Sequence, residues 1–236
     1  MIVAVLQARM SSSRLPGKVL ADLAGEPMIV RQLQRIRRAR TLTKVVVATS
    51  AEASDDPLAR VLRNRGWPVY RGDLNDVLGR VCSAVRWATP AGSCTHVVRL
   101  TADCPLADPE VIDEAVRLAL ASRAAYTSNC EHRTYPDGLD VEVIEAGARF
   151  TAAVRASDPL DREHVTPYVR TRPTLYPQAH LVHPRDRSAL RWTVDHPEDL
   201  AFVRQVFEAL YPADPEFSSQ DVFDLLADHP ELSAAA

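Results

Sequence analysis

The chain has 236 residues, of which 46% are apolar, and its 28 basic and 31 acidic side chains give a formal net charge of −3. A chain of this length can bury one substantial core, so we expect a single domain over residues 1–230, followed by a frayed tail at 231–236. The small net charge excludes the broad basic surface typical of nucleic-acid-binding proteins and favours a small anion as the partner. No apolar stretch is long enough for a membrane helix, so we expect no membrane partner and a cytoplasmic location.

Apolar runs typical of strands alternate with helical patterns in the first half of the chain. We expect strands at 2–6, 44–49, 69–70, 96–100, 125–128, 139–144 and 191–194. Helices are expected at 27–39, 57–64, 76–87 and 109–121, with two more near the end, one reaching about 210 and one at 221–226. The short connections predict an α/β fold of three layers around a mostly parallel, twisted sheet.

The helix expected at 27–39 carries three arginines outside its apolar face. Arg31, Arg35 and Arg38 are spaced along this helix. We interpret them as a solvated face, because an amphipathic helix places its charged residues opposite the core. They are not taken as evidence for nucleic-acid binding.

A short polar loop, residues 7–18, follows the first strand. It carries three cations, Arg9, Arg14 and Lys18, among three serines and a glycine. Small residues leave main-chain N–H groups accessible to anionic oxygens while the cations neutralise their charge, so we expect the loop to bind a nucleoside triphosphate. Its spacing differs from the P-loop and from the glycine pattern of dinucleotide-binding folds. The alternative is a plain solvated basic loop.

The loop resembles the signature of the sugar-activating nucleotidyltransferases. Its sequence, Gln-Ala-Arg-Met-Ser-Ser-Ser-Arg-Leu-Pro-Gly-Lys, has every fixed position of the pattern shared by the CMP-Kdo synthetase group and the SpsF-type spore-coat polysaccharide proteins. This resemblance implies a Rossmann-like nucleotidyltransferase fold of the GT-A-like kind. It also implies a homodimer that transfers CMP from CTP to a small acidic acceptor, such as a sugar acid, and releases pyrophosphate.

Three segments are expected to meet at one edge of the sheet. The loop of residues 7–18, Thr49-Ser50 and Thr101-Ala102 each follow a strand, and ligands collect at the carboxyl ends of parallel strands. We therefore expect one nucleotide crevice there. The candidate nucleotide-binding residues are Leu6, Gln7, Ala8, Arg9, Ser11, Ser12, Ser13, Arg14, Lys18, Thr49, Ser50, Asp76, Arg80, Thr101 and Ala102.

Asp76 and Arg80 lie where the resembled family places a nucleotide-facing loop and the start of a helix. Asp76 can equally cap that helix, and Arg80, one turn later, can pair with it, so both interpretations stay open. The resemblance implies cytosine as the base. We expect it to be read by main-chain groups near residues 6–8 and by the strand ends at Thr49 and Thr101.

Two aspartates at strand ends are candidate metal ligands. Asp103 and Asp195 each come directly after an expected strand, and Mg²⁺ takes one or two carboxylates in addition to substrate phosphates. The segment 194–200 resembles the motif whose aspartates hold metal ions in the CMP-Kdo synthetase group, although a plain N-cap role for Asp195 is the alternative. The candidate catalytic residues are Arg14, Lys18, Asp103 and Asp195, with Mg²⁺ as the cofactor.

The acceptor is expected to differ from Kdo. Thr101 and Ala102 stand where the Kdo enzymes have Gln-Gly, whereas the segment at about 130–190 resembles the SpsF-type proteins and is interpreted as a small insertion for acceptor binding and dimerisation. The candidate acceptor-binding residues are Asp137, Asp140, Arg162, Glu163 and His164. Surface pairing of Arg162 with Asp158 or Glu163, and local packing of His164, are the structural alternatives.

Two other functions stay open at this point. A metal-dependent glycosyltransferase has a similar fold, but it would be expected to carry Asp-x-Asp after the central strand, where this chain has Asp103-Cys104-Pro105. A non-catalytic nucleotide-binding protein would bind nucleotide without turnover.

Overall fold

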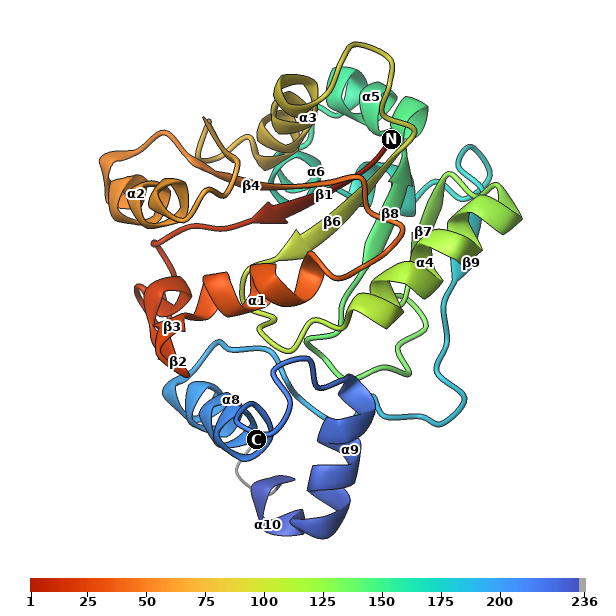
Figure 1. Cartoon of the computed structure of the whole chain (residues 1–236). Helices are drawn as coiled ribbons and strands as arrows, with labels where there is room; N and C mark the ends of the chain where they lie inside the picture. The colour runs from red at the N-terminus through yellow and green to blue at the C-terminus, as the bar shows by residue number, and fades with distance from the viewer. Residues whose placement is uncertain (234–236) are drawn as a thin grey trace.

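The centre of the molecule is a seven-stranded sheet in the order β5-β4-β1-β6-β8-β7-β9 (Figure 1). The computed structural model describes residues 1–233. The strands of the sheet are β1 (Ile2–Gln7), β4 (Lys44–Ser50), β5 (Val69–Gly72), β6 (His96–Thr101), β7 (Tyr126–Ser128), β8 (Glu142–Glu145) and β9 (Gln178–His180). A separate hairpin pairs β2 (Asp22–Leu23) with β3 (Glu26–Pro27).

Strand directions confirm the predicted α/β fold with a mostly parallel sheet. Strand β1 pairs in parallel with β4 and β6, and β4 pairs in parallel with β5. Strand β8 runs antiparallel to both β6 and β7, and β9 is parallel to β7. Because β4, β1 and β6 are parallel neighbours, their carboxyl ends meet at one edge of the sheet.

Helices cover both faces of the sheet and give three layers (Figure 1). Helices α1, α2 and α4 pack on one face, where α8 and α9 extend the core, and α3 and α5 pack on the other. The helices are α1 (Met28–Ile36), α2 (Asp56–Asn64), α3 (Val77–Ala88), α4 (Pro109–Ser122), α5 (Ala146–Arg155), α6 (Pro159–His164), α7 (Pro167–Arg170), α8 (Pro197–Leu210), α9 (Ser219–Asp228) and α10 (Pro230–Ser233), with single 3₁₀ turns η1 (Lys18–Leu20) and η2 (Ala53–Asp55).

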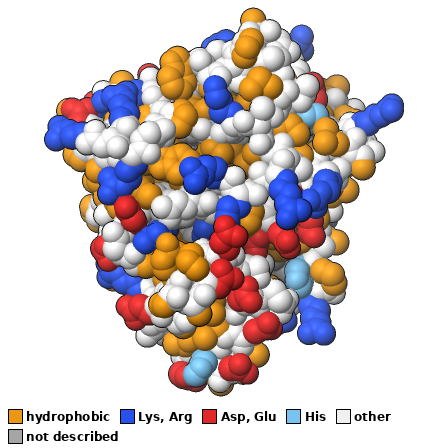
Figure 2. All heavy atoms as spheres, in the orientation of Figure 1, with side chains coloured by type: hydrophobic (Ala, Val, Ile, Leu, Met, Phe, Trp, Pro, Cys, Tyr) orange, Lys and Arg blue, Asp and Glu red, His pale blue; other side chains and the backbone are white. Residues whose placement is uncertain are grey.

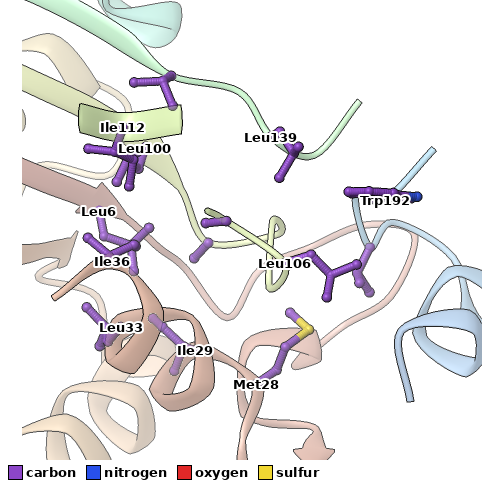
Figure 3. Packing of buried hydrophobic residues seen from close by; sticks show 14 of the residues in the cluster. Leu6, Met28, Ile29, Leu33, Ile36, Leu100, Leu106, Ile112, Leu139 and Trp192 are labelled. Carbon is purple, nitrogen blue, oxygen red and sulfur yellow. The ribbon is translucent and has the colours of Figure 1, made fainter. Parts of the chain in front are cut away.

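Alternation of side chains along β1 builds two hydrophobic cores. Ala4 and Leu6 enter the cluster shared with α1 and α4, whereas Val3 and Val5 enter the cluster under α3. Figure 3 shows Leu6 and Leu100, from neighbouring strands, among the side chains of the first cluster. The loop after β1 therefore starts from a strand that is fixed by close packing on both faces.

The second half of the chain departs from the predicted elements. Residues 192–194 form no strand, and only Arg191 makes a single bridge, with Asp137. The N–H groups of Trp192 and Val194 instead donate to the carbonyl oxygens of Asp137 at 2.6 Å and Asp103 at 2.7 Å. Helices α5, α6 and α7 were not predicted. Helices α6 and α7 are short and begin at prolines, which also read as turn signals.

The interpretation of Arg31, Arg35 and Arg38 as a solvated face is wrong for two of them. Arg31 and Arg35 are only 9% and 3% exposed. Arg35 donates to the carbonyl oxygens of Ala107 at 3.0 Å and Phe217 at 2.9 Å, and Arg31 donates to the Tyr211 hydroxyl at 2.6 Å. The C-terminal segment covers this face of α1, and a single-helix pattern gives no information about such docking.

The segment predicted as an insertion is continuous with the central sheet. Residues 130–190 supply strands β8 and β9 and helices α5 to α7. The tail expected to fray from residue 231 starts with α10, and residues 234–236 lie outside the described residues. Among the described residues, no helix combines the length and apolar character that crossing a bilayer requires.

Charged side chains of both signs share the surface. On the face drawn in Figure 2, basic side chains lie beside acidic ones, and no wide patch of a single sign is present. This distribution agrees with the formal net charge of −3.

Candidate active site

The loop of residues 7–18 is anchored by a buried carboxylate that the sequence did not reveal. Asp55, in η2, is fully buried. It accepts hydrogen bonds from Met10 N at 2.7 Å, Thr49 Oγ1 at 2.8 Å, Ser50 N at 3.0 Å and Ser50 Oγ at 2.5 Å. Burial raises the pKa of the Asp55 carboxyl, but the hydrogen bonds from Met10, Ser50 and Thr49 outweigh it and hold that pKa below its ordinary value. Asp55 thus ties the loop to the end of β4.

A tight turn then leads the loop back toward the sheet. The N–H groups of Ser12 and Gly17 both donate to the Met10 carbonyl, at 2.9 and 3.1 Å. Gly17 has φ of 75°, a left-handed conformation that glycine adopts without steric cost. The turn places Lys18 at the start of η1, where its side chain is buried.

Lys18 joins the two candidate metal-binding aspartates. Its Nζ donates to Val194 O at 2.6 Å, to Asp195 Oδ1 at 3.0 Å and to Asp103 Oδ2 at 3.4 Å. Arg14 forms an ion pair with the same Asp195 oxygen at 2.8 Å. Burial raises the pKa of Asp195, but its contacts with Lys18 and Arg191 dominate and lower it. All four predicted catalytic residues therefore lie in one cluster, which we call the Lys18 cluster.

Asp195 is oriented by two neighbours that sequence reasoning did not assign. Arg191 donates to Asp195 Oδ2 at 2.9 Å and also contacts Asp199 at 3.3 Å and Asp137 at 3.2 Å. Asp199 accepts from the main-chain N–H groups of Asp195 at 2.7 Å and His196 at 2.8 Å. The only sequence signal for these contacts is the spacing of four residues from Arg191 to Asp195 and from Asp195 to Asp199. The strand expected at 191–194 obscured this signal.

The Lys18 cluster lies in a cavity of about 240 Å³, the first cavity. Predicted residues from the loop, from the end of β6 and from the acceptor-binding set line it together. The lining residues are Gln7, Ala8, Arg9, Ser12, Ser13, Arg14, Lys18, Val19, Val77, Arg80, Thr101, Ala102, Asp103, Glu163, His164 and Asp195.

Five predicted nucleotide-binding residues do not line this cavity; one of them, Asp76, lines a separate hollow. Leu6 is fully buried in the core, and Ser11 is an exposed loop residue outside the lining. Thr49 and Ser50 are buried against Asp55, so their contribution is to fix the loop. The main-chain groups expected to read the base are also engaged.

The sheet occupies these main-chain groups at the end of β1. The Gln7 carbonyl accepts from Ala102 N at 3.1 Å, and Ala8 N donates to the Ala48 carbonyl at 3.2 Å. Each of these groups therefore already has a partner within the protein.

Arg80 lines the first cavity but does not pair with Asp76. It is 3% exposed and donates through Nη1 to the carbonyl oxygens of Asp73 and, at 3.0 Å, Leu74. Burial, followed by repulsion from Arg9, lowers the pKa of Arg80. Two cations facing each other in a cavity favour an anionic occupant.

Asp76 and Arg162 form an ion pair at 2.5 Å and line a separate hollow between α3 and α5. Asp76 caps α3 by accepting from Gly79 N at 2.9 Å. Arg162 also donates to the carbonyls of Ala153 at 3.2 Å and Ala156 at 3.0 Å. The structure thus does not bring these two predicted site residues to the first cavity, and it pairs Arg162 with neither Asp158 nor Glu163.

A second cavity of about 360 Å³ adjoins the first. Thr101 and His164 line both cavities. Asp140 lines the second cavity and is held by a bidentate ion pair with Arg133 at 2.7 and 3.0 Å. Asp137 lines neither cavity; burial, and then the charge of Asp140, raises its pKa.

A strained turn holds His164 at the junction of the two cavities. Val165 has φ of 73° and ψ of −50°, and Thr166 N donates to the His164 carbonyl at 2.8 Å. These features define a γ-turn of the rare, strained kind, here at a β-branched residue. Such strain persists only where the surrounding structure enforces it, and Val165 is 1% exposed.

The carboxylates of the Lys18 cluster fit a magnesium ion in their chemistry. Asp103 and Asp195 contact the same ammonium group, and Asp103 Oδ1 has only a 3.5 Å contact with Cys104 Sγ. No group of three or more His, Cys, Asp or Glu side chains suited to a metal exists among residues 1–233. Two carboxylates suffice only where substrate phosphates and water complete the coordination, as Mg²⁺ commonly requires.

Comparison with known proteins identifies the family. The family model for cytidylyltransferases matches residues 3–212. The chain belongs to the cytidylyltransferase family. It is therefore a CTP-using nucleotidyltransferase, which excludes the glycosyltransferase alternative and assigns an enzymatic activity.

Individual relatives agree with this assignment. The chain is 30% identical to the spore coat polysaccharide biosynthesis protein SpsF of Bacillus subtilis, with 98% of this chain and 96% of that protein covered. It is 35% identical to the 3-deoxy-manno-octulosonate cytidylyltransferase of Geobacter sulfurreducens over 61% of this chain and 56% of that protein. The solved structure of a cytidylyltransferase from Leptospira borgpetersenii superposes with a TM-score of 0.91 at 29% identity, covering 98% of this chain and 96% of that one.

Proposed function

We propose that this cytidylyltransferase uses Mg²⁺ to transfer CMP from CTP to a small acidic acceptor that occupies the second cavity, with release of pyrophosphate. The observation that supports the proposal most strongly is the Lys18 cluster. Two cations, Arg14 and Lys18, meet two carboxylates there from distant parts of the chain. The N···O distances of their three ion pairs are 2.8 to 3.4 Å. The cluster lies in the same cavity as five other residues of the loop of residues 7–18, namely Gln7, Ala8, Arg9, Ser12 and Ser13.

The loop supplies the positive charge that the triphosphate needs. Arg9, Arg14 and Lys18 all line the first cavity. Phosphoryl transfer depends mainly on positioning and charge stabilisation, because the phosphorus chemistry needs no covalent enzyme intermediate. We assign Arg9 and Arg14 to the β- and γ-phosphates, and Lys18 to the α-phosphate as charge develops on it.

Asp103 and Asp195 are the proposed magnesium ligands. Bound between these carboxylates and the substrate, Mg²⁺ would supply positive charge that neutralises the phosphates and would make an acceptor hydroxyl more acidic. The chain's own contribution is to fix both carboxylates: Lys18 contacts both, and Arg191 and Asp199 hold Asp195 in place.

The second cavity is the proposed acceptor site, because it opens beside the first and shares Thr101 and His164 with it. An acceptor there would lie next to the α-phosphate, as in-line attack requires. Asp140 and His164 are the proposed acceptor contacts, with Glu163 near the phosphates. The Geobacter relative is named for Kdo as its acceptor, but Thr101-Ala102 in this chain favours a different acid.

We also propose that the chain forms a homodimer through α5 and α6. Phe150, Val154 and Leu160 are 55%, 70% and 61% exposed there. Large apolar side chains gathered on neighbouring short helices are typical of a protein interface. Light scattering of the purified chain, with Val154→Asp as the disrupting variant, tests this assembly.

The proposed function is tested by pyrophosphate release in the presence of CTP, Mg²⁺ and a panel of sugar acids, phosphates and phosphonates. Turnover with at least one acid, lost on chelation and restored by Mg²⁺, is the expected result. Turnover that chelators leave unchanged would refute the metal requirement, and turnover only with neutral sugars would refute the acidic acceptor.

A further inference from the structure

Gln7 presents a hydrogen-bond donor of fixed orientation at the end of β1. Gln7 lines the first cavity, and its side-chain Oε1 accepts from Arg99 Nε at 3.0 Å. A guanidinium group only donates, so this contact determines which end of the amide is which. The oxygen faces Arg99 and the NH₂ group faces away from it. Within residues 1–233, no group accepts a hydrogen bond from Gln7 Nε2.

Arg99 is itself held by a buried ion pair. Glu142 lies directly opposite Arg99 in the β6–β8 pairing and contacts its Nη1. Tyr126 donates its hydroxyl to the other Glu142 oxygen at 2.6 Å. Burial lowers the pKa of Arg99, but Glu142 outweighs this effect and raises it, so Arg99 stays charged. Turning the Gln7 amide would therefore place two donors against each other at a rigid, charged neighbour.

Several other polar groups of the first cavity already have partners. The Lys18 cluster holds its charges in mutual contact, and the Gln7 carbonyl and the Ala8 N–H are paired within the sheet. An uncharged donor of fixed direction is the kind of group that distinguishes bases, which differ in the pattern of donors and acceptors on their edges.

We propose that Gln7 Nε2 donates to the N3 acceptor of cytosine and so selects CTP over UTP, with Arg99 as the positioning residue that keeps the amide from turning. This inference rests on the proposed function. Cytosine N3 carries a lone pair, whereas uracil N3 carries a hydrogen. The NH₂ group of Gln7 therefore pairs with cytosine and opposes a second donor in uracil.

Calorimetric titration with CTP and with UTP, each with Mg²⁺, tests the proposal without an acceptor. The wild-type Kd for UTP is expected to exceed that for CTP by about tenfold or more. The UTP complex lacks one hydrogen bond that CTP makes and leaves the Gln7 donor unpaired. Gln7→Glu, which only accepts, should lose or invert this preference, and Gln7→Met should reduce it to within about threefold. Gln205→Glu, the same chemical change at an exposed position of α8, is the control and should keep the wild-type ratio.

A second variant tests the positioning role. Arg99→Met alone would leave the Glu142 carboxylate buried and unpaired, so it is combined with Glu142→Gln. The released amide can then turn its oxygen toward uracil N3–H. UTP binding should strengthen relative to CTP, whereas a merely structural role for Arg99 would weaken both nucleotides equally.

The outcomes separate this inference from the proposed function. A wild-type protein that binds neither nucleotide would refute the proposed function itself. A wild-type preference for CTP that survives in Gln7→Glu and Gln7→Met would refute only the role of Gln7. An equal loss of CTP and UTP affinity in Gln7→Met would show that the amide contacts the ribose or the phosphates, which also overturns base reading.

Discussion

Replacement of Asp55 by Asn tests how the loop of residues 7–18 is held. The carboxylate accepts one hydrogen bond at Oδ1, from Met10 N, and three at Oδ2, from Thr49 and Ser50. An amide can keep its oxygen toward the three donors, but its NH₂ group then faces Met10 N–H. The change removes one charge-assisted hydrogen bond and leaves a donor unpaired without altering the shape of the side chain.

The expected loss is about 2–4 kcal/mol of unfolding free energy, the sum of a charge-assisted bond and an unpaired donor. CTP binding should weaken as well, because binding must then order the loop. Urea unfolding and calorimetry measure the two effects. Asp56→Asn is the matched control: its ion pair with Arg71 at 2.6 Å is half-exposed, so the change should cost less than about 1 kcal/mol.

The pH dependence of unfolding provides a second test of the Asp55→Asn variant. Asp55 has a folded-state pKa below its ordinary value, so its contribution is fully present above the unfolded-state pKa of about 3.9 and is lost as pH falls through the lower folded value. The difference in stability between wild type and Asp55→Asn should therefore shrink below about pH 4. Equal stability of the two proteins at pH 7, with unchanged CTP affinity, would refute the anchoring role.

Three further changes probe other parts of the site and its frame. Gly138→Ala should destabilise the fold by at least about 3 kcal/mol in urea, because φ is 117° and a Cβ would lie 2.5 Å from the Trp192 carbonyl carbon; near-wild-type unfolding would contradict this close approach. Asp103→Asn and Asp195→Asn should keep the circular dichroism spectrum and lower Mg²⁺-dependent pyrophosphate release at least about 100-fold, and a wild-type rate in either would remove that residue from the proposed site. Arg162→Met should lower stability by about 1 kcal/mol, since its pair with Asp76 is partly exposed, and should leave the KM for the acceptor unchanged; a raised KM at wild-type stability would instead support the predicted acceptor contact.

The sequence predicted the members of the Lys18 cluster from two kinds of signal. Asp195 was found through the resemblance of segment 194–200 to a family motif, because the strand expected before it does not form. Asp103 stands directly after a strand with a clear apolar pattern, and the loop carries its cations at the spacing of a known signature. Parallel strands bring such ends together whatever the rest of the chain does. The strands and helices in the first half of the chain were also predictable, because their apolar patterns are clear.

The contacts that tertiary docking creates were not predictable from local pattern. Arg31 and Arg35 look like surface residues in a helical projection, but the C-terminal segment covers them. Asp55 and the Gln7–Arg99 contact depend on packing between segments far apart in the chain. The γ-turn at Val165 follows no propensity rule, since β-branched residues avoid positive φ.

The contacts of Lys18 set an order of events during folding. Its partners lie 85 positions away at Asp103, 176 at Val194 and 177 at Asp195. Contacts of such long sequence separation form late and slowly. A large loop must close, at a cost in chain entropy, before such a contact can stabilise the fold. A growing chain has made every strand of its central sheet, the last being β9, before residues 191–195 follow. The contacts of Lys18 with Val194 and Asp195 can therefore form only in a late step, when the segment after β9 docks.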